Sequence, residues 1–170
     1  MALRHASARP FVVGITGGIA AGKSTVCRML SSMGVAVWDA DRAAKSLYRT
    51  NHDLLEKVVQ HFGPEVGLQD GQGDIVDVDK SALARNVFGH AEELAWLESQ
   101  VHPAVARAFD TWLDDQRACT WVVREAAILF ESNSDLGCNA VVTVEALKWP
   151  RGAQGAGYAA HPTWDAHQHA

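Results

Sequence analysis

An α/β fold, in which a parallel sheet of about four strands is flanked by helices, is predicted from two patterns in the sequence. Short apolar runs typical of buried strands occur at residues 11–15, 35–38, 121–125 and 140–145. Stretches with the helical spacing of apolar residues separate these runs, which predicts right-handed crossovers between parallel strands. Ligands bind at the carboxyl ends of the strands in such sheets, so the residues that follow each run are the candidate functional residues.

A phosphate loop follows the first apolar run. Gly17, Gly22, Lys23 and Ser24 match the Walker A pattern G-x-x-x-x-G-K-[ST], and an ordinary glycine-rich turn would not explain Lys-Ser-Thr at the helix start. Glycines let backbone N–H groups surround phosphate oxygens, and the next helix directs its positive end at the same anion. We expect Lys23 to reach the β- and γ-phosphates of ATP and to act in catalysis, and Ser24 to ligate Mg²⁺. The residues expected to contact the nucleotide are Gly17, Gly18, Ile19, Ala20, Ala21, Gly22, Lys23, Ser24 and Thr25.

The helix after the phosphate loop is expected to end at Gly34. Its apolar face, at helical spacing, consists of Val26, Met29, Leu30 and Met33. A second helix is expected after residues 39–41. Its inward side chains are Ala43, Ala44, Leu47 and Tyr48.

Residues from about 50 to 117 are expected to form a helical substrate-binding region. Asp53 is expected to cap a helix that ends at Gly63-Pro64. Residues 67–74 predict a turn-rich surface loop. The helices expected after that loop lie at about 79–88, 92–101 and 104–117, with His102-Pro103 breaking the chain between the last two.

Composition excludes several classes of protein. The chain has 170 residues, 48% of them hydrophobic, and a formal net charge of −5, so a single domain without a basic nucleic-acid footprint is expected. No apolar stretch reaches the length of a membrane span. Cys27, Cys119 and Cys138 are widely spaced, which favours a reduced, cytoplasmic chain. Residues 1–10 lack a hydrophobic signal-peptide segment and are expected to form a flexible leader.

Several motifs resemble the dephospho-CoA kinase family, in that family's order, over residues 11 to about 146. The first is the phosphate loop, and the second is Val37-Trp38-Asp39-Ala40-Asp41. The others are Phe62-Gly63-Pro64-Glu65-Val66, Leu97-Glu98 leading to His102-Pro103, and Ile128-Leu129-Phe130-Glu131. The resemblance implies a three-layer P-loop NTPase fold, similar to nucleoside monophosphate kinases. It also implies transfer of the ATP γ-phosphate to the 3′-hydroxyl of dephospho-CoA, the last step of coenzyme A biosynthesis.

Two carboxylates where the second apolar run turns into a helix are candidates for the chemistry. We expect Asp41 to accept the proton of the attacking hydroxyl, and Asp39 to orient Mg²⁺ or water. The alternative is that Asp41 only caps the following helix.

Two further residues have open roles in substrate binding. Glu125 stands where the family has an acid at the end of the third strand, and it either helps to hold Mg²⁺ through water or pairs with Arg124. His102 resembles the substrate-side histidine of the family, and the alternative is a cap at a helix end.

The sequence departs from the family pattern at two places. Ala20 and Ala21 replace a common Gly-Ser, and an alanine at position 20 costs about 1 kcal/mol if φ is positive there. After residue 146 the family continues with a lid helix that carries arginines, a final strand and a final helix. Residues 147–170 match none of these, and residues 148–170 lack Val, Ile, Leu, Met and Phe, so we expect a disordered tail. A shifted reading frame, a mis-joined gene model and a natural tail are the alternatives.

The kinase domain is therefore expected at residues 11–146. Lid arginines stabilise the charge on a transferred phosphoryl group, so we expect low or absent activity from the chain as it stands. The alternative functions are a nucleotide-binding remnant without catalysis and a kinase for another small metabolite. No nucleic-acid or membrane partner is expected, and the sequence does not indicate an oligomeric state.

Overall fold

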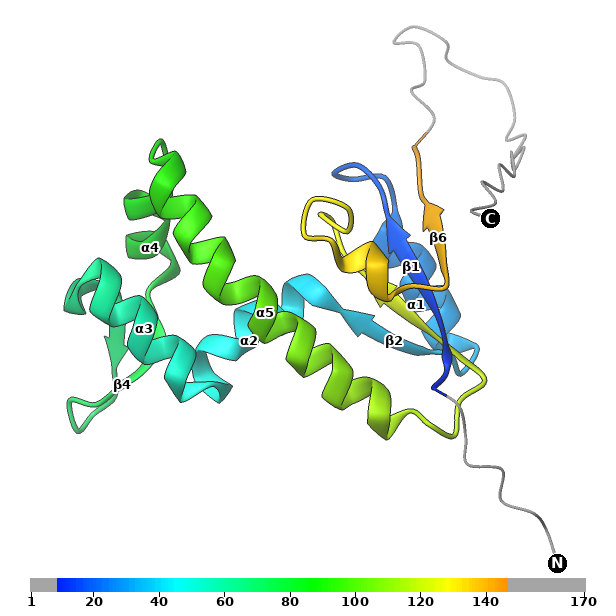
Figure 1. The fold of residues 1–170 in the computed structure, drawn as a ribbon, viewed down its shortest axis with the longest axis horizontal. Coiled ribbons are helices and arrows are strands. Elements are labelled where there is room, and N and C mark those ends of the chain that lie inside the picture. The colour runs from blue at the N-terminus through cyan, green and yellow to red at the C-terminus, as the bar shows by residue number, and fades with distance from the viewer. Residues whose placement is uncertain (1–8, 147–170) are drawn as a thin grey trace, which may run out of the picture.

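The computed structural model describes residues 9–146 and places a parallel sheet at one end of the molecule and a helical region at the other (Figure 1). Nearly all of the expected leader and the whole of the expected tail, residues 147–170, lie outside the described residues. No helix in the described part of the chain is long and apolar enough to cross a membrane.

The sheet has four parallel strands in the order β2-β5-β1-β6, as the sequence predicts. The strands are β1 (Phe11–Thr16), β2 (Ala36–Asp39), β5 (Trp121–Glu125) and β6 (Ala140–Thr143). Strand β5, one of the two central strands, supplies two fully buried valines, Val122 and Val123. The register places Glu125 of β5 between Ile15 of β1 and Asp39 of β2, so the carboxyl ends of three strands meet.

Helix α1 (Lys23–Ser32) covers one face of the sheet. Its packing differs from the expected apolar face, because Met29 and Met33 are 62% and 78% exposed. The buried residue is Cys27, which packs with Val26 and Leu30 against the strands. The face is thus rotated toward Cys27, a residue whose small apolar character gives a weak periodic signal.

The helical region begins with α2 (Ala40–Thr50) and α3 (His52–Phe62). The cap of α3 is Asn51, whose Oδ1 accepts a hydrogen bond from the Leu54 amide at 3.0 Å, so the expected cap at Asp53 is wrong. The short 3₁₀ helix η1 (Pro64–Val66) follows α3.

An antiparallel hairpin stands where only a surface loop was expected. Its strands are β3 (Gly67–Gln69) and β4 (Ile75–Val78), and helix α4 (Lys80–Val87) follows. The turn residues between the strands agree with the predicted loop. The flanking strands are too short for alternation to be recognised in the sequence.

Helix α5 (Ala91–Asp115) is continuous and contains Pro103, so the break expected at His102-Pro103 is wrong. One stretch of the helix packs in the core of the helical region through Leu97 and Val105. A later stretch packs on the sheet through Phe109 and Leu113. After β5, the chain forms turns and the short 3₁₀ helix η2 (Ser134–Gly137) before it enters β6.

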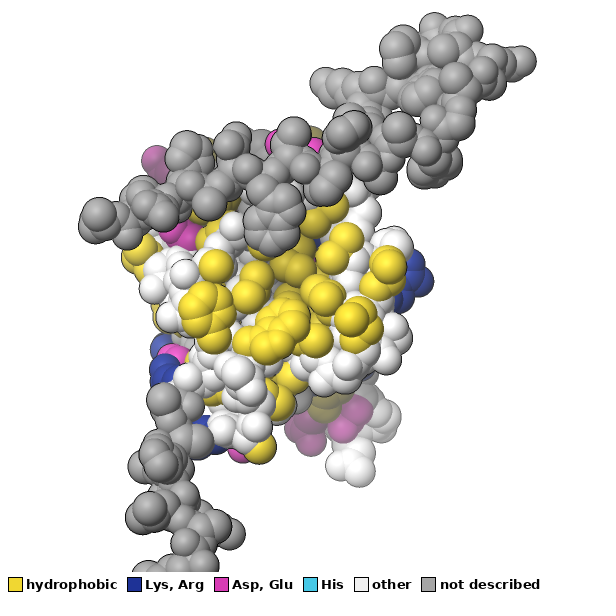
Figure 2. Space-filling model, turned by 90° about the vertical axis from the view of Figure 1, so that its right-hand side faces the viewer, with side chains coloured by type: hydrophobic (Ala, Val, Ile, Leu, Met, Phe, Trp, Pro, Cys, Tyr) yellow, Lys and Arg dark blue, Asp and Glu magenta, His cyan; other side chains and the backbone are white. Residues whose placement is uncertain are grey.

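Strand β6 is an edge of the sheet within the described residues, and all four of its residues are exposed. Val141 is 37% exposed and Val142 is 44% exposed. Figure 2 shows hydrophobic side chains gathered on the side of the molecule where β6 lies. An apolar strand with an unpaired backbone edge is a template for pairing with another chain.

We expect the purified protein to self-associate through β6 with increasing concentration. A lysine on an edge strand opposes such pairing, so Val142→Lys is expected to stay monomeric at concentrations at which the wild type associates. Analytical ultracentrifugation over a concentration series measures this. Val142→Thr, which keeps a β-branched side chain without charge, is the control. A wild type that is monomeric at all concentrations would contradict the prediction.

Candidate active site

The phosphate loop connects β1 to α1 and wraps around the Lys23 side chain. The Lys23 Nζ donates hydrogen bonds to the carbonyl oxygens of Gly17 at 2.8 Å and Gly18 at 3.0 Å. Gly22 caps α1 in a left-handed conformation with φ of 96°. The free amides at the start of α1 and the lysine therefore lie together, as binding of a nucleotide phosphate requires.

Only glycine fits at position 17, because the backbone has a positive φ there and the Val144 carbonyl lies close to its Cα. Its φ is 143°, and a Cβ atom there would stand 2.1 Å from the Val144 carbonyl oxygen. The Val144 amide donates to the Thr16 carbonyl at 2.8 Å. The segment after β6 thus lies directly against the start of the phosphate loop.

Ala20 adopts the left-handed conformation that the sequence analysis considered, with φ of 60°. This conformation costs an alanine about 1–2 kcal/mol, because its Cβ lies close to the following carbonyl oxygen. The neighbouring Ala21 is not among the described residues with positive φ. The strain is therefore confined to one of the two alanines.

Ser24 and Glu125 meet on the α1 side of the sheet. The Ser24 Oγ donates a hydrogen bond to the Glu125 Oε1 at 2.9 Å. Hydroxyl and carboxylate oxygens are ligands that suit Mg²⁺, which takes few protein ligands and keeps several waters. The residues present therefore fit a magnesium ion held at the phosphates of a bound nucleotide.

Arg124 does not pair with Glu125, so that alternative is wrong. Successive side chains of a strand point to opposite faces of the sheet. Arg124 accordingly lies on the α5 side, with its guanidinium carbon 4.3 Å from the centre of the Phe109 ring.

Asp39, and not Asp41, caps α2. The Asp39 Oδ1 accepts a hydrogen bond from the Arg42 amide at 2.8 Å. The alternative that Asp41 only caps this helix is therefore wrong, and Asp41 lies in the first turn. Burial and the negative charge of Asp39 raise the pKa of Asp41, with a smaller contribution from Glu125 and opposing ones from Lys45 and Lys23. The charges of Asp39, Glu125 and Lys23 all affect the Asp41 carboxyl group, because these residues converge at the same edge of the sheet.

Asp41 and His102 line one small cavity of about 110 Å³. Its walls come from α2, from the middle of α5 and from the segment after β5, which contributes Ala126, Ile128 and Ser132. His102 stands in the interior of α5, so its alternative role as a cap at a helix end is wrong. The structure thus separates the two predicted substrate residues: His102 lines the Asp41 cavity, and Glu125 contacts the phosphate loop.

Cys27 lies behind the phosphate loop and is 4% exposed. Burial, together with the nearby Glu125 carboxylate, raises the pKa of its thiol to about 12. The thiol therefore stays protonated at neutral pH and is not a nucleophile.

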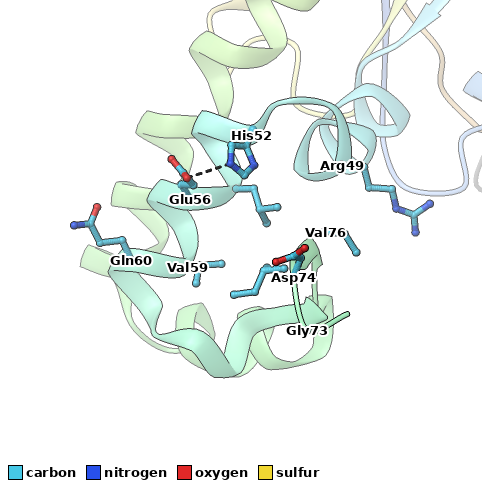
Figure 3. A pocket seen from close by; sticks show the side chains of 10 residues that line it. Arg49, His52, Glu56, Val59, Gln60, Gly73, Asp74 and Val76 are labelled. Atoms are coloured by element: carbon cyan, nitrogen blue, oxygen red, sulfur yellow. Dashed lines mark ion pairs between the residues drawn. The ribbon is translucent and has the colours of Figure 1, made fainter. Parts of the chain in front are cut away.

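A cavity of about 810 Å³, larger than the Asp41 cavity, contains none of the predicted site residues. Figure 3 shows it between α3 and the β3–β4 hairpin. An ion pair between His52 and Glu56 at 3.1 Å lies on the α3 side, and Asp74 lies on the hairpin side. Cavity volume alone therefore does not identify the candidate active site of this protein.

Two serines that line the Asp41 cavity, Ser132 and Ser134, are not predicted from the sequence. Both follow β5 in a segment of turns, where no spacing pattern distinguishes a lining residue from a solvent-exposed one. Arg124 was considered only as a partner of Glu125. The alternation of β5 was sufficient to place Arg124 on the opposite face.

The strain at Ala20 predicts opposite responses from two adjacent alanines. Ala20→Gly relieves about 1–2 kcal/mol of strain and adds about 0.4–1 kcal/mol of unfolded-state entropy. Its stability should therefore equal that of the wild type or exceed it by up to about 1.6 kcal/mol. Ala21→Gly, the matched control, should lose about 0.5–1 kcal/mol. Urea unfolding measures both, and equal destabilisation of the two variants would contradict the assignment.

Comparison with known proteins identifies one family. A profile of the Dephospho-CoA kinase family matches residues 11–150. The dephospho-CoA kinase of Chlorobaculum tepidum is 38% identical over 142 residues, which cover 81% of this chain and 66% of that protein. The dephospho-CoA kinase of Chlorobium chlorochromatii is 40% identical over 139 residues, which cover 81% of this chain and 65% of that protein. The chain thus spans just under two thirds of the length of these relatives.

Solved structures agree with the fold. TT1252 from Thermus thermophilus superposes with a TM-score of 0.66 at 33% identity, over 81% of this chain and 66% of that one. Dephospho-CoA kinase from Campylobacter jejuni superposes with a TM-score of 0.60 at 24% identity, over 78% of this chain and 64% of that one, and shows likeness of fold alone. From the family match and the identity of its relatives, the chain belongs to the dephospho-CoA kinase family.

Proposed function

We propose that this protein transfers the γ-phosphate of ATP to the 3′-hydroxyl of dephospho-CoA in the cytoplasm. The observation that carries the proposal is the convergence of two half-sites at one edge of the sheet. Lys23, Ser24 and Glu125 form the nucleotide side. Asp41 and His102 line a cavity on the acceptor side.

On the nucleotide side, residues 17–25 bind the phosphates through backbone amides and Lys23. Lys23 exchanges its bonds to loop carbonyls for bonds to the β- and γ-phosphates. Ser24, whose hydroxyl is hydrogen-bonded to Glu125, would ligate Mg²⁺, and Glu125 would help to hold the ion through water. When bound, the ion neutralises charge on the phosphates.

On the acceptor side, Asp41 accepts the proton of the attacking hydroxyl. Its carboxylate is not engaged in capping α2, because Asp39 has that role. Asp39 keeps a second carboxylate oxygen free to orient Mg²⁺ or water. His102 positions the acceptor from the facing wall of the cavity.

Incubation of the full chain with ATP, Mg²⁺ and dephospho-CoA tests the proposal. Coenzyme A is identified by mass spectrometry under single-turnover conditions, which detect slow chemistry. We expect phosphorylation of dephospho-CoA to coenzyme A. We expect no phosphorylation of the other hydroxyl-bearing metabolites in a substrate panel. Phosphorylation of a different metabolite, or no phosphorylation, would overturn it.

Lys23→Ala is expected to weaken ATP binding by about 10- to 100-fold, the range for loss of hydrogen bonds to a charged group. Isothermal titration with a non-hydrolysable ATP analogue and Mg²⁺ measures this. Lys57→Ala, which removes an exposed lysine from α3, is the control and should bind as the wild type does. Equal affinity of all three proteins would exclude residues 17–25 as the nucleotide site.

Asp41→Asn removes the proton acceptor and keeps the shape of the side chain. Turnover should fall by about 10²-fold or more, while ATP affinity stays unchanged. Asp39→Asn is a matched variant, because asparagine retains the cap of α2 but loses the charge. It should keep the helix and lose less turnover. Near-normal turnover of Asp41→Asn would exclude Asp41 as the base.

The raised pKa of Asp41 gives a dependence on pH with a definite sign. A raised folded-state pKa means that the charged form is disfavoured in the fold, so this group contributes less stability once pH rises through that pKa. Asp41→Asn should therefore melt at the same temperature as the wild type or higher at neutral pH. In the wild type, loss of turnover on acidification should begin at a higher pH than ordinary aspartate titration would produce. Coincidence with ordinary aspartate titration would contradict this assignment.

A further inference from the structure

A second cavity adjoins the Asp41 cavity. Its volume is about 220 Å³, and it lies between α5 and the segment after β5. His102, Ser132 and Ser134 line both cavities, so the two share one wall. The second cavity therefore lies next to the place where an acceptor hydroxyl would meet Asp41.

The lining of the second cavity is suited to an anion. Arg124 contributes positive charge, and Ser132, Asn133 and Ser134 contribute polar groups. The acid in the lining is Asp110, which is already paired with Arg9 at 3.1 Å. The volume is several times the roughly 30 Å³ share of one water molecule, which gives room for phosphate groups.

Arg124 is the residue of this lining that most strongly indicates an anion site, because it is a buried cation that is not paired with a described carboxylate. It is 4% exposed, and it forms no ion pair with another described residue. Its guanidinium donates to the Ser134 carbonyl at 3.2 Å and to the Ser134 Oγ at 3.0 Å. The Arg124 Nε has no hydrogen-bond partner among the described residues.

Such an arrangement is unfavourable unless an anion completes it. A buried charge carries a desolvation penalty of several kcal/mol that a serine hydroxyl and a carbonyl do not offset. The stacked Phe109 ring attracts the cation only weakly in comparison. An arginine also presents several N–H donors that match phosphate oxygens.

We propose that this cavity binds the diphosphate group of the acceptor, with Arg124 as its principal ligand. The inference rests on the proposed function, because dephospho-CoA carries its diphosphate on the same ribose that presents the 3′-hydroxyl. Arg124 then distinguishes acceptors with a diphosphate from bare nucleosides.

Binding of two acceptors to the full chain tests the inference. The phosphate loop is first saturated with Mg²⁺ and a non-hydrolysable ATP analogue, so that it does not bind the added phosphates. Dephospho-CoA and adenosine are then titrated by calorimetry. Arg124→Gln should weaken dephospho-CoA binding by about 10- to 100-fold and leave adenosine binding unchanged. Equal weakening of both ligands, or no weakening, would overturn the inference.

A second variant avoids the risk that a buried substitution disturbs the fold. Ala106 is exposed on α5 and lines the same cavity. Ala106→Glu places a negative charge there and should weaken dephospho-CoA binding several-fold, without an effect on adenosine. Ala106→Gln has nearly the same shape and no charge, and should bind as the wild type does. Equal affinities of these two variants for dephospho-CoA would overturn the inference.

Inorganic pyrophosphate separates failure of the inference from failure of the proposed function. If the chain does not bind dephospho-CoA, the proposed function is wrong. Binding of pyrophosphate by the nucleotide-saturated wild type, abolished in Arg124→Gln, would then still support an anion site in the cavity. Absence of Arg124-dependent binding of both dephospho-CoA and pyrophosphate would overturn the anion site as well.

Discussion

A continuous α5 is the constraint on which the arrangement of this protein depends. The helix carries one set of apolar side chains into the core of the helical region and another onto the sheet. A proline inside a helix costs about 3 kcal/mol. Burial of each large apolar side chain contributes about 1.5–3 kcal/mol, and α5 buries Leu97, Val105, Phe109 and Leu113 on the two sides of Pro103. Packing therefore exceeds the cost of the proline, and the helix stays whole.

The position of His102 follows from that continuity. A broken helix would end at His102 and leave its side chain to cap the end or to face solvent. In the continuous helix, His102 is held between the helical region and the sheet, opposite Asp41. The same residue that precedes the unfavourable proline thus becomes a wall of the Asp41 cavity.

The sequence was sufficient for features that depend on local pattern. Buried strands, the phosphate loop and the carboxylates after the strands follow from apolar runs and from motif spacing, and the structure contains them where they were expected. The continuity of α5 was not predictable, because it depends on contacts from two separate clusters. The sequence also could not predict which of Asp39 and Asp41 caps α2. Both are good cap residues, and the end of β2 decides between them.

The alternation of β5 explains how one short strand serves both halves of the site. Val122 joins the cluster on the α5 side, and Val123 joins the cluster on the α1 side. The two residues that follow continue this alternation beyond the apolar core. Glu125 points toward α1 and contacts Ser24, on the side of the proposed nucleotide site. Arg124 points toward α5 and lines the cavity that His102 also lines, the proposed anion site. On a strand, adjacent side chains point to opposite faces of the sheet. The positive charge of Arg124 and the negative charge of Glu125 are therefore separated, and each can act on a different ligand.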